Sequence, residues 1–220
     1  MQTILSENQK RLLDLLGREK TVTDNFYLSG GTALAEFYLR HRYSEDLDFF
    51  SENEFDPMSI SVVLKKIGSA AGTIKVEQSQ HFNMNLFFLD LKDGDKIKTE
   101  FTYFPFARIE EGTTEHGIRV DSLTDIAVNK IFTIYQKPRS RDFIDLFFIL
   151  KENPNFSVDE LSRQAQVKFD SYLSPVQLGA QYLKASELKD YPRMIKKIDD
   201  EEWQNYFLEE AKKLKDRVIE

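Results

Sequence analysis

The fold of this chain is decided by two neighbouring segments, SGGTAL at residues 29–34 and DLDFF at residues 46–50. A glycine pair precedes an expected helix that runs from Thr32 to Arg42, and the second segment reads as a strand that carries Asp46 and Asp48. Residues i and i+2 of a strand point to the same face, with Cα atoms roughly 6.6 Å apart. Two carboxylates held in this way can share one Mg²⁺ or bridge two metal ions. The pattern therefore favours metal-dependent chemistry on this strand.

The glycine pair, Gly30 and Gly31, indicates a phosphate site. A turn of this kind presents backbone N–H groups and a helix N-terminus, which is where phosphate chains bind. Ser29 and Thr32 flank the pair and would add hydroxyl donors. The chain has neither the P-loop pattern nor the dinucleotide fingerprint. A turn beside two carboxylates predicts nucleotidyl or phosphoryl transfer, while a tight strand-to-helix turn without a ligand is the structural alternative.

A third carboxylate on an adjacent strand would complete a metal site of this type. Glu100 is the first candidate, because it alternates with the apolar Phe101 in an expected strand. Asp90, at the end of the preceding expected strand, is the second candidate. An ordinary surface glutamate is the structural alternative for Glu100.

Composition limits the classes of protein that the chain can be. Its 220 residues suit one domain or two small ones, and 41% hydrophobic with 30% charged residues is typical of a globular protein. The absence of cysteine excludes disulfides and thiolate zinc sites. We expect no membrane span, no signal peptide and a cytoplasmic location. The net charge of −7 argues against broad coating of DNA, but it leaves room for a local contact with RNA.

Hydrophobic periodicity predicts an α+β fold in two domains. Residues 1–121 alternate between strand and helix patterns, and the sequence DGDK predicts a hairpin turn at residues 93–96. From Ser122 onward almost every pattern is helical. We therefore expect an N-terminal mixed sheet with helices over residues 1–121 and a helical C-terminal domain over residues 122–220.

Two charged residues of the helical half stand among apolar neighbours. Lys130 lies on the first helix, where a cation could neutralise a β- or γ-phosphate, although a solvated helix face is the simpler interpretation. Asp145 lies in the apolar run FIDLFFIL, where an unpaired carboxylate would be strongly unfavourable. Pairing with Lys130 or Arg141 is the structural interpretation of Asp145, and orienting a phosphate-binding lysine is the functional one. The three histidines have no metal-ligand spacing.

Four segments in this order resemble the AbiEii/AbiGii-type nucleotidyltransferase toxin family, within the DNA polymerase β-like nucleotidyltransferase superfamily. They are YLSGGTAL at residues 27–34, RYSEDLDF at 42–49, DIAVNK at 125–130 and RDFIDL at 141–146. Each segment alone is moderately specific, but all four in order are hard to obtain by chance. The resemblance implies a nucleotidyltransferase-like N-terminal domain.

The resemblance also implies an activity and a set of site residues. The activity is transfer of NMP from an NTP to an acceptor such as tRNA, dependent on Mg²⁺ or Mn²⁺. The metal ligands would be Asp46, Asp48 and Glu100, and Lys130 and Asp145 would join them as catalytic residues. The nucleotide-binding residues would be Ser29, Gly30, Gly31, Thr32, Arg42, Ser44 and Lys130.

The family implies a biological setting, and two other functions stay open. The chain would be the toxin of a toxin–antitoxin or phage-defence system, with a separately encoded antitoxin protein as partner. One alternative is a nucleotide- or partner-binding protein with the same fold and little turnover. The other is a transferase that acts on protein hydroxyls or on small molecules.

Overall fold

The computed structural model describes the backbone of residues 3–219 and the side chains of residues 3–214. It contains two compact units. The first comprises the chain up to Tyr38 together with Ser44–Ser122, and the second comprises Leu39–Tyr43 together with the chain from Leu123 onward. A mixed sheet with helices is followed by a helical region, so the predicted α+β class is confirmed.

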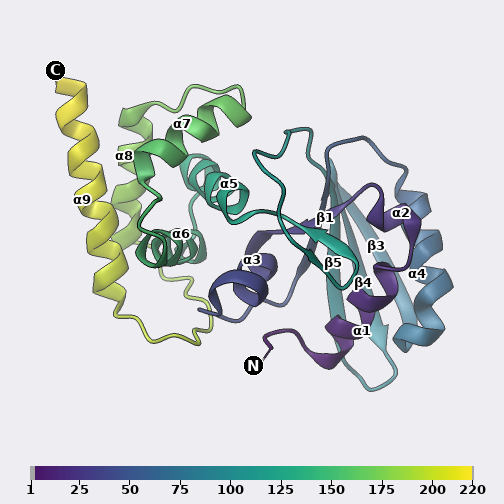
Figure 1. Cartoon of the computed structure of the whole chain (residues 1–220). Helices are drawn as coiled ribbons and strands as arrows, with labels where there is room; N and C mark the ends of the chain where they lie inside the picture. The colour runs from purple at the N-terminus through teal and green to yellow at the C-terminus, as the bar shows by residue number, and fades with distance from the viewer. Residues whose placement is uncertain (1–2, 220) are drawn as a thin grey trace. The chain divides into compact units, whose positions relative to one another are not determined.

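The first unit contains a seven-stranded mixed sheet with the strand order β3-β4-β5-β2-β1-β7-β6. Figure 1 labels β1, β3, β4 and β5 of this sheet. The strands are β1 (Tyr27–Ser29), β2 (Leu47–Ser51), β3 (Thr73–His81), β4 (Met84–Leu91), β5 (Lys96–Tyr103), β6 (Thr114–Glu115) and β7 (Ile118–Val120). Strand β2 is antiparallel to β1 and parallel to β5, so it lies in the middle of the sheet. The expected hairpin turn between β4 and β5 is present, with Gly94 at φ +88°.

One face of this sheet builds the hydrophobic core, and the other carries half-buried polar groups. Along β2 the side chains alternate between buried Leu47 and Phe49 and half-buried Asp48 and Phe50. Phe49 stacks on Phe101 of β5 with 4.7 Å between ring centroids. Helices α1 (Glu7–Leu16) and α4 (Pro57–Ala71) pack together, and α4 also packs on β3. The period-two pattern of β2 therefore directs its carboxylate to the polar face.

The helix that follows β1 is shorter than its sequence suggests. It begins as α3 (Gly30–Ala33) and continues as a π-helical segment, Leu34–Leu39, whereas the sequence predicted a helix to residue 42. Arg40 has φ +51°, a left-handed conformation that ends the helix. In the π-helical segment, Glu36 accepts hydrogen bonds from Thr3 Oγ1 at 2.8 Å and from the Ile4 N–H at 2.6 Å. These hydrogen bonds connect the N-terminal segment to the π-helical segment that continues α3.

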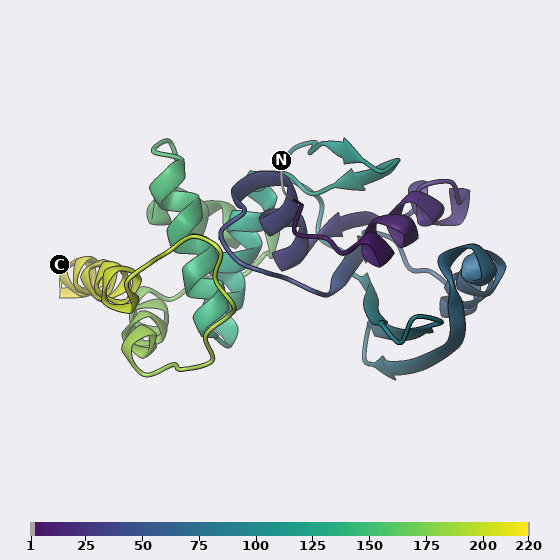
Figure 2. The same ribbon diagram turned by 90° about the horizontal axis from the view of Figure 1, so that it is seen from below.

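Helices build most of the second unit. They are α5 (Leu123–Gln136), α6 (Ser140–Glu152), α7 (Val158–Lys168), α8 (Pro175–Leu183) and α9 (Asp200–Ile219). Helix α9 lies along α8 (Figures 1 and 2). The core of the unit is aromatic, with Phe143 of α6 at 4.7 Å from Phe207 and 6.0 Å from Trp203 between ring centroids. Within the described chain, none of the helices has the length and apolar character needed to cross a membrane.

Candidate active site

Three predicted metal ligands share the polar face of the sheet. Asp48 of β2 pairs in register with Glu100 of β5 on one side and with Ser29 of β1 on the other. Paired residues on neighbouring strands point to the same face, about 4.8 Å apart. Asp46 directly precedes β2, which begins one residue later than the sequence suggested, and it lies two positions from Asp48. All three carboxylates are half-buried.

The two candidates for the third carboxylate occupy different places on the sheet. Glu100 is opposite Asp48 across β2 and β5, and its other neighbour is Leu86 of β4. Asp90 lies four residues further along β4, about 13 Å along the strand. There its Oδ1 is 3.0 Å from Lys96 Nζ. The register therefore brings Glu100, and not Asp90, beside Asp48.

Gly30 and Asp48 are in close contact. Gly30 has φ +74°, and a Cβ atom at this position would lie 2.6 Å from Oδ2 of Asp48. Any side chain would thus meet both backbone strain and a steric clash. The carboxylate and the glycine turn occupy adjoining space, as a phosphate chain and its metal ion would require.

The hydroxyls beside the glycine pair hold the turn together. Ser29 Oγ donates a 2.7 Å hydrogen bond to Oδ2 of the buried Asp121. Thr32 is fully buried, and its Oγ1 lies 2.9 Å from Ser44 Oγ and within hydrogen-bonding distance of the Asp46 carbonyl. These contacts tie the glycine helix to the loop that leads into β2.

Lys98 is a site residue that the sequence analysis missed. Its Nζ lies 2.7 Å from Oδ2 of Asp46, and the two side chains are 35% and 38% exposed. Lys98 stands two residues before Glu100 on β5 and therefore on the same face. The alternation in KIKTE, residues 96–100, was the local signal that could have placed a lysine beside the carboxylates.

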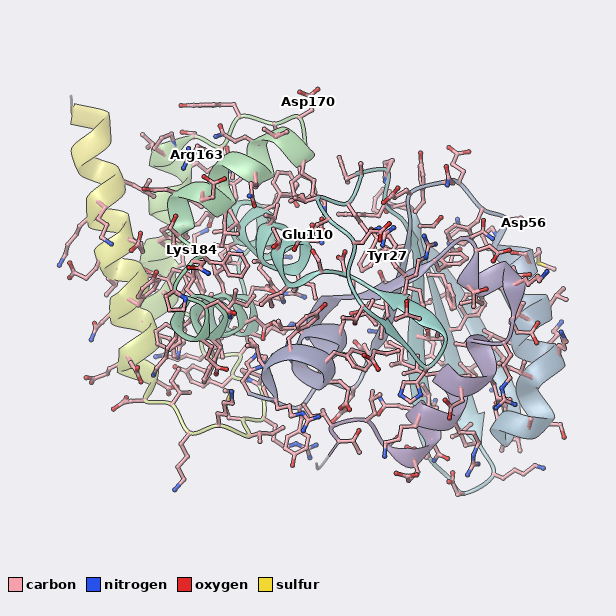
Figure 3. The ribbon with its side chains drawn as sticks, viewed as in Figure 1. Tyr27, Asp56, Glu110, Arg163, Asp170 and Lys184 are labelled. Atoms are coloured by element: carbon pink, nitrogen blue, oxygen red, sulfur yellow. The ribbon has the colours of Figure 1, made fainter. Side chains whose placement is uncertain are left out.

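Aromatic side chains cover one end of the polar face. Tyr27 of β1, labelled in Figure 3, is buried, and the Arg108 guanidinium lies 5.0 Å from its ring centroid. Phe104, directly after β5, contacts Phe50 of β2 with 5.1 Å between ring centroids. The polar face is closed at this end of β1 and β2, whereas the carboxylates stay partly exposed.

The carboxylates have the donor chemistry of a site for a divalent cation, although they do not converge on one point. Within the described side chains, no three His, Asp or Glu groups converge closely enough to hold a metal ion. Asp46, Asp48 and Glu100 nevertheless supply the hard oxygen donors that Mg²⁺ and Mn²⁺ prefer, and they share one face. Asp48 also fills the space that a Cβ of residue 30 would need. The donor set fits, and the ion pair of Asp46 with Lys98 is the contact that a metal ion would have to replace.

The other predicted site residues meet in a buried ion cluster in the second unit. Asp145 of α6 is fully buried, and its two oxygens accept from Arg42 Nε at 2.6 Å and Nη2 at 2.8 Å. Lys130 Nζ lies 2.6 Å from Asp145 and 2.8 Å from the equally buried Asp142. Arg139 Nε binds Asp142 at 2.7 Å. Three basic side chains thus face two carboxylates.

The cluster keeps both carboxylates ionised. Burial raises the pKa of Asp145, but the charges of Lys130 and Arg42 outweigh it and hold this pKa well below its ordinary value. Burial likewise raises the pKa of Asp142, and Lys130 with Arg139 brings it below its ordinary value. The predicted pairing of Asp145 with Lys130 is present, whereas Arg141 is exposed.

His41 is also part of this cluster, although its sequence context gave no sign of a role. It is fully buried, and its Nε2 lies 2.7 Å from Oδ1 of Asp145. Since the carboxylate is ionised, Nε2 is the nitrogen that donates. The other nitrogen, Nδ1, has no hydrogen-bond partner within the described part of the chain. Arg42 and His41 lie 103 and 104 residues before Asp145, so no local pattern links them to it.

Comparisons with known proteins agree with this architecture. The family model described as nucleotidyl transferase AbiEii toxin, Type IV TA system, matches residues 14–216, which include all four sequence motifs. An uncharacterized protein of Aquifex aeolicus is 31% identical over 150 residues, which are 67% of this chain and 68% of that protein.

Solved structures share the fold. The crystal structure of JHP933 from Helicobacter pylori has a TM-score of 0.60 at 21% identity, covering 97% of this chain and 94% of that one. A second H. pylori structure has a TM-score of 0.61 at 22% identity and covers 97% of both chains. With the family model spanning nearly the whole sequence, the chain belongs to the AbiEii nucleotidyltransferase toxin family.

Proposed function

We propose that this protein transfers a nucleoside monophosphate from an NTP to an acceptor hydroxyl, in a reaction that requires Mg²⁺ or Mn²⁺. Membership of the family supports nucleotidyl transfer in general. The observation that carries the specific proposal is the position of Asp48, in register with Glu100 and in contact with the Gly30 turn. The carboxylates proposed to bind the metal ion and the glycine turn proposed to bind phosphate are adjacent there.

The residues have distinct roles in this proposal. Asp46, Asp48 and Glu100 hold the divalent cation, which when bound stabilises the charge on the reacting phosphate and on the leaving pyrophosphate. The backbone N–H groups of Gly30 and Gly31 hold the triphosphate. The acceptor oxygen bonds to the α-phosphorus, the bond to the bridging oxygen breaks, pyrophosphate leaves, and the hydroxyl proton passes to solvent.

The buried cluster has an electrostatic part in the same proposal. Lys130, Arg42 and Arg139 bring three positive charges to the cluster. Cations of this kind would favour a triphosphate. Lys130 would neutralise phosphate charge, and Asp145 would orient the side chain of Lys130.

Family membership supports the proposed biological setting, and the acceptor is proposed from the resemblance of the sequence motifs. RNA, with tRNA as the first choice, is the proposed acceptor, and the chain would act as the toxin of a pair with a separately encoded antitoxin. The net charge of −7 requires that any RNA contact be local. Protein hydroxyls and small molecules are the other acceptors that the experiment must distinguish.

Incubation of the purified protein with each α-labelled NTP, Mg²⁺ and total cellular RNA or total protein tests the proposal. We expect label in RNA, abolished by EDTA and by Asp48→Asn. Asp90→Asn, which removes a carboxylate from the same sheet face outside the site, should remain active. Label in protein would identify the alternative acceptor, and full activity in EDTA would contradict the metal assignment.

A growth assay tests the toxin role separately. Expression of the wild-type chain alone should arrest growth, and Asp48→Asn should relieve the arrest. Nucleotide binding without transfer to any acceptor, together with equal toxicity of both forms, would support the alternative of a binding protein.

A further inference from the structure

The ion pair between Lys98 and Asp46 lies beside the other two proposed metal ligands, Asp48 and Glu100. Lys98 Nζ is 2.7 Å from Asp46 Oδ2, and both side chains are about one-third exposed, so ions from solvent can reach the pair. Lys98 shares its strand and its face with Glu100. Asp46, a proposed metal ligand, thus already has a cationic partner from the protein itself.

Two consequences follow from the charges of this pair. An ammonium group and a divalent cation compete for the same carboxylate, so Lys98 opposes binding of the metal ion to Asp46. The same ammonium attracts the phosphates of a nucleotide, because charge-assisted hydrogen bonds to phosphate are strong. Lys98 therefore acts on the two ligands in opposite directions.

We propose that Lys98 couples binding of the metal ion to binding of the nucleotide. It neutralises Asp46 while the metal ion is absent, and it is released to the triphosphate when the divalent cation takes Asp46. This inference rests on the proposed function for the identity of the site. It adds a residue that contacts the nucleotide and a reason why metal ion and triphosphate bind together.

The chain offers a matched control in Lys96. It lies two residues before Lys98 on β5, on the same face, and its Nζ is 3.0 Å from Oδ1 of Asp90. Lys96→Gln removes the same charge and the same kind of aspartate pair, at a point further from Glu100. Any effect of net charge alone appears in both variants.

The experiment measures binding, not turnover. Mn²⁺ binding to the full-length protein without nucleotide is titrated by electron paramagnetic resonance, and binding of ATP in EDTA is measured by equilibrium dialysis. Compared with Lys96→Gln, we expect Lys98→Gln to bind Mn²⁺ about fivefold more tightly, which corresponds to loss of an exposed ion pair of about 1 kcal/mol. Metal-free ATP should bind more weakly to Lys98→Gln.

A double-mutant cycle supplies a second route. Asp46→Asn releases Lys98, so metal-free ATP should bind more tightly to this variant, and the gain should disappear in the double variant Asp46→Asn with Lys98→Gln. The cycle compares folded variants at an exposed pair, and circular dichroism verifies their fold.

Each outcome is decisive. Equal or weaker Mn²⁺ binding by Lys98→Gln, relative to Lys96→Gln, overturns the role of Lys98 and leaves the proposed function standing. Mn²⁺ binding that is the same in wild type and Asp48→Asn shows that the metal site itself is wrong, and it overturns both proposals. The opposite shifts for metal ion and ATP are a signature that loss of packing would not produce.

Discussion

A Cβ atom on residue 30 would lie 2.6 Å from Oδ2 of Asp48, so the Asp48 carboxylate has its place only because residue 30 carries no side chain. Strands β1 and β2 pair so that Ser29, the residue before the turn, is opposite Asp48. The two motifs that stand apart in the sequence are therefore a single structural element. Four predictions test this element and the buried cluster.

Gly30→Ala should abolish nucleotidyl transfer, and Gly94→Ala should not. Both glycines have positive φ, so alanine at either position should lower the free energy of unfolding by about 1–2 kcal/mol. Only position 30 has a carboxylate in the way, whereas a Cβ at Gly94 meets nothing within 4 Å. Urea unfolding and the transfer assay measure the two effects. A Gly30→Ala protein with the wild-type rate would show that the position of Asp48 is unimportant.

Glu100→Gln should lower the transfer rate by at least about a hundredfold, since it removes charge beside the reacting phosphate. Asp90→Asn should leave the rate within about twofold of wild type, because Asp90 lies further along β4 with Lys96. Rates at saturating Mg²⁺ distinguish the two carboxylates. If Asp90→Asn lowered the transfer rate more than Glu100→Gln, Asp90 would be the third metal ligand.

Asp145→Asn should destabilise the protein in a manner that depends on pH. The pKa of Asp145 is well below its ordinary value of 3.8, so its carboxylate stabilises the fold above that pH, and this stabilisation is lost as the pH falls through the folded-state pKa. We expect the free energy of unfolding to fall by about 3 kcal/mol at neutral pH, because the cationic partners of Asp145 are left buried without its negative charge. Urea unfolding across the acid range should show that the difference in free energy of unfolding between wild type and variant becomes smaller below pH 3.8. A difference that does not depend on pH would mean that packing, not charge, is responsible.

Lys130→Met and Lys168→Met should separate stability from function. Both lysines form ion pairs with buried aspartates of the second unit, Lys168 with Asp125 at 2.6 Å. Both variants should therefore unfold at lower urea concentration. If Lys130 also neutralises phosphate, only Lys130→Met should weaken ATP binding by isothermal titration. Equal ATP binding by the two variants would reduce Lys130 to a structural role.

Local patterns predicted the elements whose signals are contained in a few residues. The alternation of β2 and β5 gave the strands and the shared face of Asp48 and Glu100, because a period of two is visible in five residues. Short elements such as β6 and helix α2 (Lys20–Thr23) were missed, because two to four residues carry no period. The expected helix also ended early, at Leu39.

The contacts that complete the site are tertiary and have no such signal. Lys98 and Asp46 are 52 residues apart, and Arg42 and Asp145 are 103 apart. The motif with RYSEDLDF even places Arg42 and Ser44 in one segment, while the structure assigns them to different units. Only an apolar setting such as that of Asp145 indicated that a partner had to exist.

The assignment of Leu39–Tyr43 to the second unit governs how the protein can be divided. The chain passes between the units three times, so no single cut yields two complete fragments. A fragment that starts at residue 123 would lack Arg42 and His41 and would retain a buried Asp145 deprived of their charge and hydrogen bond. Such a fragment should fold poorly alone and be rescued by a synthetic peptide that spans residues 39–43. The N-terminal half of the gene therefore encodes a segment that the second unit needs, so a truncation after either unit cannot yield a complete second unit by itself.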